Sequence, residues 1–439
     1  MHPLEKIIYP LGRPFSPLYA LAMKIRAACY AKGVLRRYRA AVPVISIGNL
    51  TMGGTGKTPA VISVCLSLQQ WGYRPAVISR GYGGRPLAPV NIVSDGTTIF
   101  LPAGICGDEP RLLAEALPGV VVITAKKRSL GAQAAIKKYQ CDILVLDDGF
   151  QHLAMARDLD IVLLTQESPL GNGRVFPGGP LREPCSALAR ADLLVVTSFS
   201  ASTAHDTRVT AQKLTALFHD KKTVSDHGIR CQGLAHLPSG KRLQCAGDAR
   251  HRLRDVTGVQ SIADNTADSV PCNRLQKHPC RSEALRTEPD TSAQEVMLAA
   301  DITKPLFSTG YQAIALRGMD DGGAVRRLPL DYIAGKKIFL FCGIGSPEGF
   351  VTLAGATKSR LAGSRFFRDH HRYTAADIRE LMDAARGRHA DVLLTTAKDY
   401  VKLTPSSFGP MELLALDVRL HLDAAFLRRL QQSLKRIAS

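Results

Sequence analysis

Lys57 and Thr58 directly follow a glycine-rich turn, and their side chains are suited to binding phosphate and a metal ion. An apolar run over residues 43–47 precedes the turn, and Lys57 opens a stretch typical of a helix. In this arrangement backbone N–H groups converge on phosphate oxygens, the lysine reaches the β and γ phosphates, and the threonine hydroxyl ligates magnesium. The strict pattern has glycine at position 51, where this chain has Thr51. We predict nucleotide contacts by Gly53, Gly54, Thr55, Gly56, Lys57 and Thr58.

Two adjacent carboxylates, Asp147 and Asp148, follow the apolar residues 143–146. Such a run is typical of a buried strand, so both are expected at its carboxyl end, the usual ligand side of an open α/β sheet. A phosphate-binding loop needs an acid at the end of a neighbouring strand to hold its metal ion. Alone, the pair is equally typical of a turn. Together with Lys57 and Thr58, it predicts a site for a magnesium nucleotide.

Asp108 and His370 are candidates for proton transfer. Asp108 lies in a Gly-Asp-Glu-Pro stretch ahead of a predicted helix, where a carboxylate could accept the proton of a hydroxyl group. The same position suits a helix N-cap, and the motif alone favours that structural role. His370 and His371 follow a short predicted strand, where they could carry a proton, bind a ligand or belong to a surface loop. Neither motif establishes a catalytic role by itself.

A Gly- and Pro-rich stretch over residues 172–184 carries Asn172, Arg182 and Glu183. Over the carboxyl end of a sheet, such a loop could clamp an anionic acceptor, although loops of this composition are often plain connectors. Residues 395–402 likewise place two lysines and a carboxylate at the end of a predicted strand. Each pattern is weak in isolation.

These side chains need a scaffold that brings strand ends together, and from residue 42 the chain alternates between strand-like and helix-like runs. The alternation indicates a parallel sheet covered by helices. A second such pattern begins near residue 337, and 439 residues suffice for two domains. We expect an α/β protein with a P-loop NTPase-like sheet domain, a polar insertion and a smaller α/β domain. The predicted segments are 1–40 (basic N-terminal segment), 41–218 (P-loop domain), 219–303 (insertion) and 304–439 (C-terminal domain).

The stretch 219–303 is polar and rich in arginine and histidine, with little apolar periodicity. Its cysteines and histidines could bind a metal ion, but neither Cys-x-x-Cys nor His-x-x-x-His spacing occurs. We therefore expect a solvated, poorly ordered insertion rather than a zinc site. The ten cysteines of the chain are scattered, which favours reduced thiols in a cytoplasmic setting.

The net charge of +19 attracts polyanions, namely nucleic acid, anionic lipid or phosphorylated small molecules. Aromatic residues make up only 6% of the chain, which disfavours a protein that stacks on nucleic-acid bases. The first 40 residues are basic and amphipathic, without the roughly 18 consecutive apolar residues of a spanning helix. Such a segment can lie in a bilayer interface. A surface helix packed on its own domain fits the pattern equally well.

The order of the motifs resembles the tetraacyldisaccharide 4'-kinases of lipid A biosynthesis. The resemblance covers roughly residues 1–218 and 304–439 and leaves out the polar stretch between them. Thr51 agrees with this family's own version of the loop. The shared motifs are GNLTMGGTGKTP (48–59), RGYGG (80–84), GDEP (107–110), LDDGFQH (146–152), GNGRVFPGGPLREP (171–184), CGIGSPEGF (342–350), DHHRYT (369–374) and TAKDYVKL (396–403).

The resemblance implies transfer of the γ-phosphoryl group of ATP, with Mg²⁺, to the 4'-hydroxyl of a tetraacyl glucosamine disaccharide 1-phosphate. It also implies a cleft between two α/β domains, and an N-terminal helix at the cytoplasmic face of the inner membrane of a Gram-negative bacterium. Neither a nucleic acid nor an obligate protein partner is expected.

The same resemblance assigns roles to residues. Lys57 and Thr58 serve the nucleotide and the metal, Asp147 ligates magnesium with Asp148 beside it, and Asp108 is the base, helped by His370. Because these last two come from different domains, turnover should require closure of the cleft. The family commonly has Thr-Glu-Lys-Asp in its last motif, whereas this chain has alanine at position 397. The implied substrate contacts are Arg80, Gln151, His152, Asn172, Arg182 and Glu183.

Two other function classes fit parts of the pattern. A P-loop switch or metal-delivery NTPase would use the His- and Cys-rich stretch, bind zinc or nickel, and hydrolyse nucleotide without lipid. A basic nucleic-acid-binding ATPase would be stimulated by DNA or RNA with a steep dependence on salt.

Overall fold

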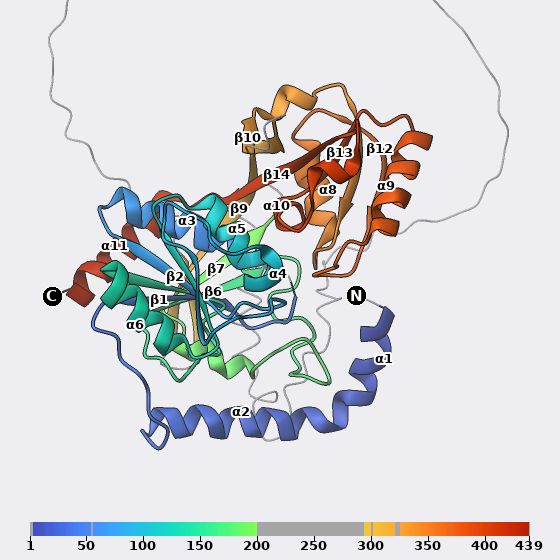
Figure 1. Ribbon diagram of the computed structural model, residues 1–439. Coiled ribbons are helices and arrows are strands. Elements are labelled where there is room, and N and C mark those ends of the chain that lie inside the picture. Colours follow the sequence, from blue (N-terminus) through green and yellow to red (C-terminus); the bar gives the residue numbers. More distant parts are fainter. Residues whose placement is uncertain (1–2, 54–55, 200–293, 300–301, 321–324, 439) are drawn as a thin grey trace, which may run out of the picture. The chain divides into compact units, whose positions relative to one another are not determined.

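The computed structural model describes residues 3–53, 56–199, 294–299, 302–320 and 325–438 (Figure 1). The predicted mixed α/β architecture is confirmed, because the described strands form one 14-stranded, mostly parallel sheet. The first seven strands are β1 (Val44–Asn49), β2 (Pro75–Ser79), β3 (Val90–Ser94), β4 (Val121–Ala125), β5 (Ile143–Asp147), β6 (Leu159–Thr165) and β7 (Leu193–Ser198). The others are β8 (Gln294–Ala299), β9 (Ile302–Met319), β10 (Val325–Leu328), β11 (Lys337–Cys342), β12 (Arg360–Phe366), β13 (Val392–Thr396) and β14 (Glu412–Leu420).

Helices connect most of these strands. The α-helices are α1 (Pro3–Gly12), α2 (Ser16–Ala31), α3 (Lys57–Gln70), α4 (Ala103–Cys106), α5 (Asp108–Ala116), α6 (Arg128–Tyr139), α8 (Pro347–Gly355), α9 (Ala375–Gly387), α10 (Ala397–Tyr400) and α11 (Ala424–Ala438). Short 3₁₀ helices are η1 (Arg13–Phe15), η2 (Cys185–Arg190), η3 (Leu330–Ile333) and η4 (Pro405–Phe408).

The sheet joins two lobes through the long strand β9. In the N-terminal lobe, which we define as β1–β7 with α3–α6, the strand order is β3-β4-β2-β5-β1-β6-β7, and only β3 is antiparallel to its neighbour. In the C-terminal lobe, defined as β10–β14 with α8–α10, the order β12-β11-β13-β14 is parallel throughout. The first half of β9 pairs with β7 and its second half with β14. The limits of independent domains remain a prediction.

Helices cover both faces of the sheet in the N-terminal lobe. Buried residues of α3 and α5, such as Leu68 and Leu113, pack in one cluster with the strands, while Ala132 and Ala135 of α6 pack in another. The central parallel strands β1, β2, β4 and β5 are buried along their whole length, as expected for strands covered on both faces. The closing helix α11 joins the α3 cluster, and its Phe426 contacts Phe307 of β9 at 5.4 Å between ring centroids.

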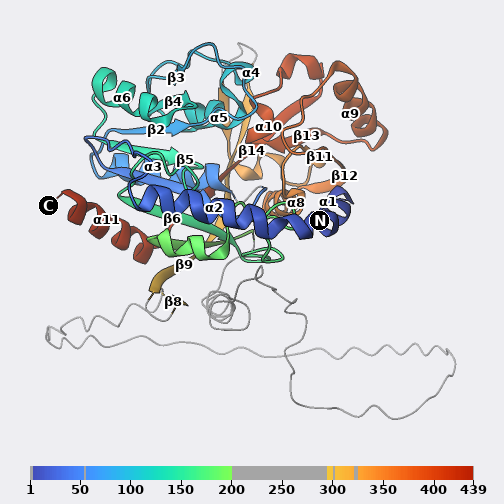
Figure 2. The ribbon, with the colours of Figure 1, turned by 90° about the horizontal axis from the view of Figure 1, so that it is seen from below.

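The basic N-terminal segment forms α1 and α2, which lie below the parallel strands in Figure 1 and in front of them in Figure 2. Ser16 holds α2 to the loop of residues 172–184, because its hydroxyl donates to the Val175 carbonyl at 2.8 Å and accepts from the Gly178 N–H at 2.8 Å. The outward face of the segment is apolar: Leu11, Phe15, Leu18, Leu21 and Ile25 are all exposed. None of the described helices is long and apolar enough to cross a membrane.

Most predicted strands and helices of the two lobes appear within a few residues of their expected bounds. The prediction omitted β3, β8, β9 and β10. The expectation of a disordered insertion, and the alternative of a metal site among its cysteines and histidines, fall on residues 219–303, of which 219–293 and 300–301 lie outside the described residues. Of that stretch the structure describes β8 and the start of β9.

Candidate active site

The phosphate-binding loop leads from β1 into α3. Gly56 has φ +70° just before the helix, and a Cβ atom there would lie 1.7 Å from the Tyr311 hydroxyl, so only glycine fits. Lys57 Nζ donates to Asn49 Oδ1 at 3.3 Å, and Asn49 Nδ2 donates to the Thr51 carbonyl at 2.7 Å. Asn49, which sequence reasoning did not single out, thus holds the lysine. The predicted contacts Gly54 and Thr55 lie outside the described residues.

The two predicted carboxylates lie beside this loop because β5 pairs in parallel with β1, opposing Asp147 to Ile47. Asp148 has φ +51° and accepts from Arg182 Nη1 at 2.9 and 2.7 Å, while Lys57 Nζ lies 3.7 Å from its Oδ1. Burial alone would raise the pKa of Asp148, but Lys57 and Arg182 lower it below its ordinary value. Asp148 is therefore an ionised partner of two cations.

Asp147 is in a different environment although it is the adjacent residue. Its Oδ2 accepts from the Ser79 hydroxyl at 2.9 Å, whereas its buried Oδ1 has no hydrogen-bond partner among the described residues. Burial, with the charges of Glu109 and Asp148, raises the pKa of Asp147 to about 6. A buried carboxylate oxygen without a partner is costly unless a cation neutralises it.

Arg128 fixes the turn that carries both carboxylates, a role that the sequence did not reveal. The side chain is buried, and its guanidinium donates to the carbonyls of Asp147 at 2.7 Å and Asp148 at 3.0 Å. These two bonds satisfy backbone acceptors at the strand end and hold its geometry.

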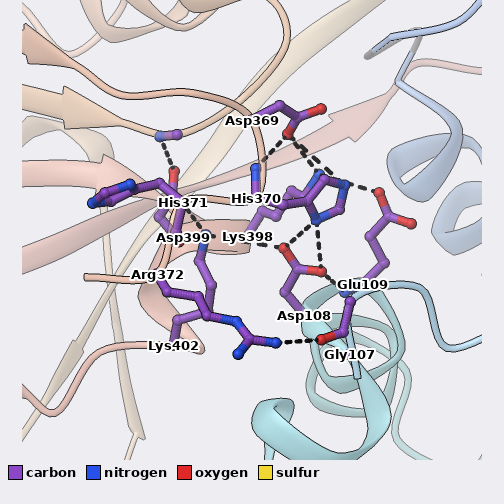
Figure 3. Close-up of polar contacts among 12 residues, drawn as sticks. Gly107, Asp108, Glu109, Asp369, His370, His371, Arg372, Lys398, Asp399 and Lys402 are labelled. Carbon is purple, nitrogen blue, oxygen red and sulfur yellow. Dashed lines mark hydrogen bonds and ion pairs between the residues drawn. The ribbon is translucent and has the colours of Figure 1, made fainter. Parts of the chain in front are cut away.

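The second group of polar residues lies where the lobes meet (Figure 3). His370 Nδ1 lies 2.9 Å from Asp108 Oδ2 and 3.1 Å from Oδ1, which brings together residues 262 positions apart. Lys402 Nζ is 3.9 Å from Asp108 Oδ2, and Lys398 Nζ is 3.2 Å from Glu109 Oε1. Thus the predicted pairing of Asp108 with His370 is present in the structure.

The motif alone favoured a role for Asp108 as the N-cap of α5, but Asp108 does not cap this helix. The helix begins at Asp108 itself, Gly107 is the N-cap residue, and the Asp108 carboxylate faces His370. Burial tends to raise the pKa of Asp108, but the hydrogen bond to His370 and the charges of Lys398 and Lys402 lower it. The same hydrogen bond raises the pKa of His370, against burial and Lys398. Asp108 is therefore ionised at neutral pH.

A cavity of about 910 Å³ is lined by residues of both lobes. His370 and Glu109 line it on the junction side, whereas Asp108 lies just behind them and is 6% exposed. The cavity therefore joins the phosphate-binding loop to the junction pair. Of the predicted site residues, those that line it are Gly53, Gly56, Lys57, Thr58, Arg80, Asp147, Asp148, Gln151, His152, Arg182 and His370.

Among the predicted substrate contacts, His152 and Gln151 have distinct surroundings. Burial, reinforced by nearby arginines, lowers the pKa of His152 to about 4, so its ring is neutral at physiological pH. Gln151 Nε2 donates to the Asn49 carbonyl at 2.9 Å, which ties this residue to the phosphate-binding loop. Arg80 lies in the same cavity wall.

Two other predicted substrate contacts are occupied within the protein and do not line this cavity. Asn172 Nδ2 donates to the Gly178 carbonyl at 3.0 Å, and its Oδ1 accepts from the Arg174 N–H at 3.0 Å. Glu183 is 2% exposed and pairs with Arg190, with Arg26 at 3.9 Å. Both residues thus hold the 172–184 loop, and Arg182 is the member of that loop that reaches the cavity.

Comparisons with known proteins agree with this geometry. The sequence model of the family described as tetraacyldisaccharide-1-P 4'-kinase matches residues 8–257 and 271–435. This match includes most of the polar stretch 219–303, so the expectation that the resemblance skips that stretch is wrong for all but 258–270.

Curated relatives carry the name tetraacyldisaccharide 4'-kinase. One from Desulfotalea psychrophila is 35% identical over 91% of this chain and 89% of its own length, and one from Syntrophus aciditrophicus is 35% identical over 92% and 85%. The crystal structure of LpxK from Aquifex aeolicus in complex with ATP has the same fold, with a TM-score of 0.60 and 24% identity over 97% of both chains. The chain therefore belongs to the tetraacyldisaccharide-1-P 4'-kinase family.

Proposed function

We propose that this protein transfers the γ-phosphoryl group of ATP to the 4'-hydroxyl of a tetraacyl glucosamine disaccharide 1-phosphate. Membership of the family and the names of the relatives support this activity. The observation that carries the proposal is the single cavity that joins a phosphate-binding loop to a carboxylate–imidazole pair. Phosphoryl transfer to an alcohol needs both parts, a site that neutralises phosphate charge and a group that accepts the hydroxyl proton.

The nucleotide phosphates belong at the N-terminus of α3. Gly53, Gly56 and Lys57 line the cavity there, and the positive end of the helix dipole would add to the attraction for phosphate. The related LpxK from Aquifex aeolicus was solved in complex with ATP, which supports ATP as the donor. Lys57 now contacts Asn49 and Asp148, and it would exchange part of these contacts for phosphate oxygens.

The residues beside the loop fit a magnesium ion. Asp147 offers a buried oxygen that has no partner among the described residues, and the Thr58 hydroxyl lines the same cavity. Oxygen ligands suit Mg²⁺, which usually takes only one or two protein carboxylates and completes its shell with water and phosphate. In agreement, the described part of the chain has no cluster of three or more His, Cys, Asp and Glu for a metal. When bound, magnesium would neutralise phosphate charge.

The two adjacent carboxylates have different environments, which supports different roles for them. Asp148 is already neutralised by Arg182 and Lys57, whereas the Oδ1 atom of Asp147 has no hydrogen-bond partner in the part of the chain that the structure describes. We therefore assign magnesium to Asp147 with Thr58. Asp148 positions Lys57 and Arg182.

Asp108 is the base in this proposal. Its carboxylate is ionised, buried and held by His370, and it lies directly behind the cavity-lining residues His370 and Glu109. A base must be unprotonated before it can accept the proton of the 4'-hydroxyl, and the cations around Asp108 ensure that state. His370 lines the cavity and would hold the carboxylate toward the acceptor.

The acceptor would bind along the wall formed by Arg80, Gln151, His152 and Arg182. The neutral ring of His152 can exchange hydrogen bonds with sugar hydroxyls, and the guanidinium groups suit the anionic acceptor. Tyr19, Met23 and Arg26 of α2 line the same cavity, so the wall continues into the N-terminal helix. This continuity supports entry of the lipid from the side of α2.

The apolar outer face of α1, η1 and α2 supports binding to the surface of the inner membrane. Leu11, Phe15, Leu18, Leu21 and Ile25 recur at three- and four-residue spacing and are between 53% and 71% exposed. A lipid with four acyl chains leaves the bilayer only at a large cost, about 0.8 kcal/mol per methylene, so the enzyme must reach the membrane. Replacement of Leu18, Leu21 and Ile25 by aspartate should move the protein from the membrane fraction to the soluble fraction. Unchanged sedimentation would overturn this part of the proposal.

The activity itself can be tested with the full-length protein, Mg-ATP and the acceptor lipid in detergent micelles. Mass spectrometry should detect a lipid product heavier by one phosphoryl group, formed only with ATP and acceptor present. Lys57→Met should abolish the product, whereas Lys138→Met, on the exposed surface of α6, should leave it unchanged. Failure of the wild-type protein to form product would refute the proposal.

A further inference from the structure

Lys398 occupies the centre of the lobe junction, with its ammonium group in contact with three side chains (Figure 3). Nζ lies 3.2 Å from Glu109 Oε1, 3.1 Å from Asp369 Oδ1 and 3.2 Å from His370 Nε2. Glu109 belongs to the N-terminal lobe, and the other two belong to the loop after β12. An ammonium group has three N–H donors, and here each has one partner.

The contact with His370 fixes which ring nitrogen carries the proton. A lysine ammonium can only donate, so Nε2 must accept with its lone pair. The proton of the neutral ring then sits on Nδ1, where it is donated to Asp108 Oδ2 at 2.9 Å. Neutral histidine in water prefers the opposite tautomer, with the proton on Nε2, so the arrangement imposed by the protein is distinctive.

We infer that Lys398 is a positioning residue for the phosphoryl transfer proposed above: it holds His370 as the neutral Nδ1–H tautomer and so keeps Asp108 available as the base. An imidazolium ring would place an Nε2–H against the ammonium of Lys398, with its other neighbour, Asp369 Oδ1, 3.9 Å away. Two donors in contact repel, so the Lys398 charge opposes a second proton on the ring. The pKa of Asp108 is higher beside a neutral ring than it would be beside an imidazolium, so Asp108 is the stronger base.

The charged groups around His370 act in both directions. Asp108 favours the imidazolium and raises the pKa of His370, whereas Lys398 lowers it. The net pKa of His370 is already raised by Asp108, so loss of Lys398 would raise it further and the imidazolium would persist to higher pH. The titratable or charged groups that face the ring among the described residues are Asp108 and Glu109 from α5, Asp369 from its own loop, Lys398 and Lys402 from α10 and the turn after it, and the edge-on ring of Tyr82.

The position of Lys398 is itself fixed by its helix. Thr396 caps α10 through the Asp399 N–H, and the fully buried Asp399 carboxylate accepts from the Gly343 N–H at 2.8 Å. Lys402 Nζ contacts the same carboxylate at 2.6 Å. The backbone on either side of Lys398 is thus anchored to the end of β11, which limits the movement of the ammonium group.

The first test measures the tautomer directly and does not depend on any activity. Long-range ¹H–¹⁵N correlation spectra of the histidine-labelled full-length protein, with His370 identified by its loss in His370→Asn, should show protonated Nδ1 and unprotonated Nε2 at neutral pH. Lys398→Met should convert the signal to Nε2–H or imidazolium, while Lys402→Met, a lysine close to Asp108 but not in contact with Nε2, should keep Nδ1–H. An Nε2–H or imidazolium signal in the wild type, or no change in Lys398→Met, would overturn the inference.

The second test measures turnover against pH. Lys398→Met should lower kcat at neutral pH by about tenfold to a hundredfold, keep the KM for ATP within about twofold, and shift the acid limb of the kcat profile to higher pH. Lys398→Arg, which keeps a cation and a donor, should restore part of the rate and the wild-type limb. If the acid limb of the kcat profile of Lys398→Met is not shifted, the proposed role of Lys398 in turnover is overturned. Absence of lipid phosphorylation in the wild type would refute the proposed function but leave the tautomer result standing.

Discussion

The phosphate-binding loop and the lobe junction both contribute to one cavity, but they are built in opposite ways. The loop site takes Lys57 and Thr58 from one short motif and adds Asp147 from the adjacent parallel strand. The junction pairs Asp108 with a histidine 262 residues away, across two lobes that strand β9 links. The loop site is therefore formed mainly by residues close together in the sequence, whereas the junction site forms only when the two lobes pack against each other.

The pKa values of the carboxylates are also shifted in opposite directions in the two sites. Burial and neighbouring acids raise the pKa of Asp147, while His370, Lys398 and Lys402 lower that of Asp108 despite its burial. Opposite shifts of this kind distinguish the tasks of acidic groups in one site. In the proposed mechanism, Asp147 would bind a cation and Asp108 would accept a proton.

The largest expected effect is on the loop side. Lys57→Met should lower the rate of lipid phosphorylation about 10³-fold, because a preorganised cation at the transferred phosphoryl group is lost. The rate is measured in detergent micelles at saturating acceptor, with Lys138→Met as the surface control. A rate within tenfold of wild type would mean that phosphate charge is neutralised elsewhere.

A smaller loss is expected when the junction is altered. Asp108→Asn removes the base but preserves the shape of the side chain, so kcat should fall about 10²-fold while ATP affinity stays within about threefold. Steady-state kinetics and calorimetric titration with ATP measure the two quantities. Equal loss of both would instead assign Asp108 to nucleotide binding or to folding.

Stability should respond to a buried ion cluster close to the junction. Arg317 of β9 is 2% exposed and contacts Glu115 of α5 and Asp417 of β14 at 2.7 and 2.8 Å, joining the lobes. Arg317→Met leaves both acids without this partner and should cost about 3 kcal/mol in the free energy of unfolding. Denaturant unfolding followed by circular dichroism measures it, and Arg74→Met, at an exposed pair with Asp142, should cost less than about 0.5 kcal/mol. Equal effects of the two changes would show that the cluster has no special role.

The smallest expected effect is a gain in stability on the loop side. The raised pKa of Asp147 means that its ionisation disfavours the ligand-free fold, by at most about 3 kcal/mol when fully charged. Asp147→Asn should therefore stabilise the protein without nucleotide above pH 6. The difference should become small as the pH falls to about 4, where the wild-type carboxyl group is protonated in the folded state and about half protonated in the unfolded state. Thermal unfolding at pH 4 and pH 7.5 measures this difference. A destabilised variant at pH 7.5 would contradict the assignment of Asp147.

The comparison also explains what the sequence could predict. The alternation of apolar runs along the sequence predicted most strands of both lobes. The spacing of motif residues predicted Lys57, Thr58 and the adjacent Asp147 and Asp148, because these features depend on neighbours along the chain. Strand β9 was missed since it contains a proline and begins at the predicted domain limit near residue 303, although tertiary pairing makes it the link between lobes. Asn172 was predicted to contact substrate, but its side chain forms a hydrogen bond within the 172–184 loop.

Supporting residues were harder to find than reacting ones. Asn49 and Arg128 act through hydrogen bonds to groups that lie close only in the folded chain, and nothing in their local spacing marks them. Lys398 was noted as a cation at the end of a predicted strand, but its contact with His370 appears only in the fold. Family resemblance supplied the pairing of Asp108 with His370, which the residues alone left open. The structure adds the cations, Lys398 and Lys402, whose charges lower the pKa of Asp108 beside His370.

The most direct measurement is a single-turnover experiment in which the full-length protein, in excess over γ-labelled ATP with Mg²⁺, is mixed with the acceptor lipid in micelles. The label should appear in the lipid, with little inorganic phosphate, and should remain in ATP when the lipid is omitted. Release of labelled phosphate at the same rate with or without lipid would contradict a kinase and identify a nucleotide hydrolase instead.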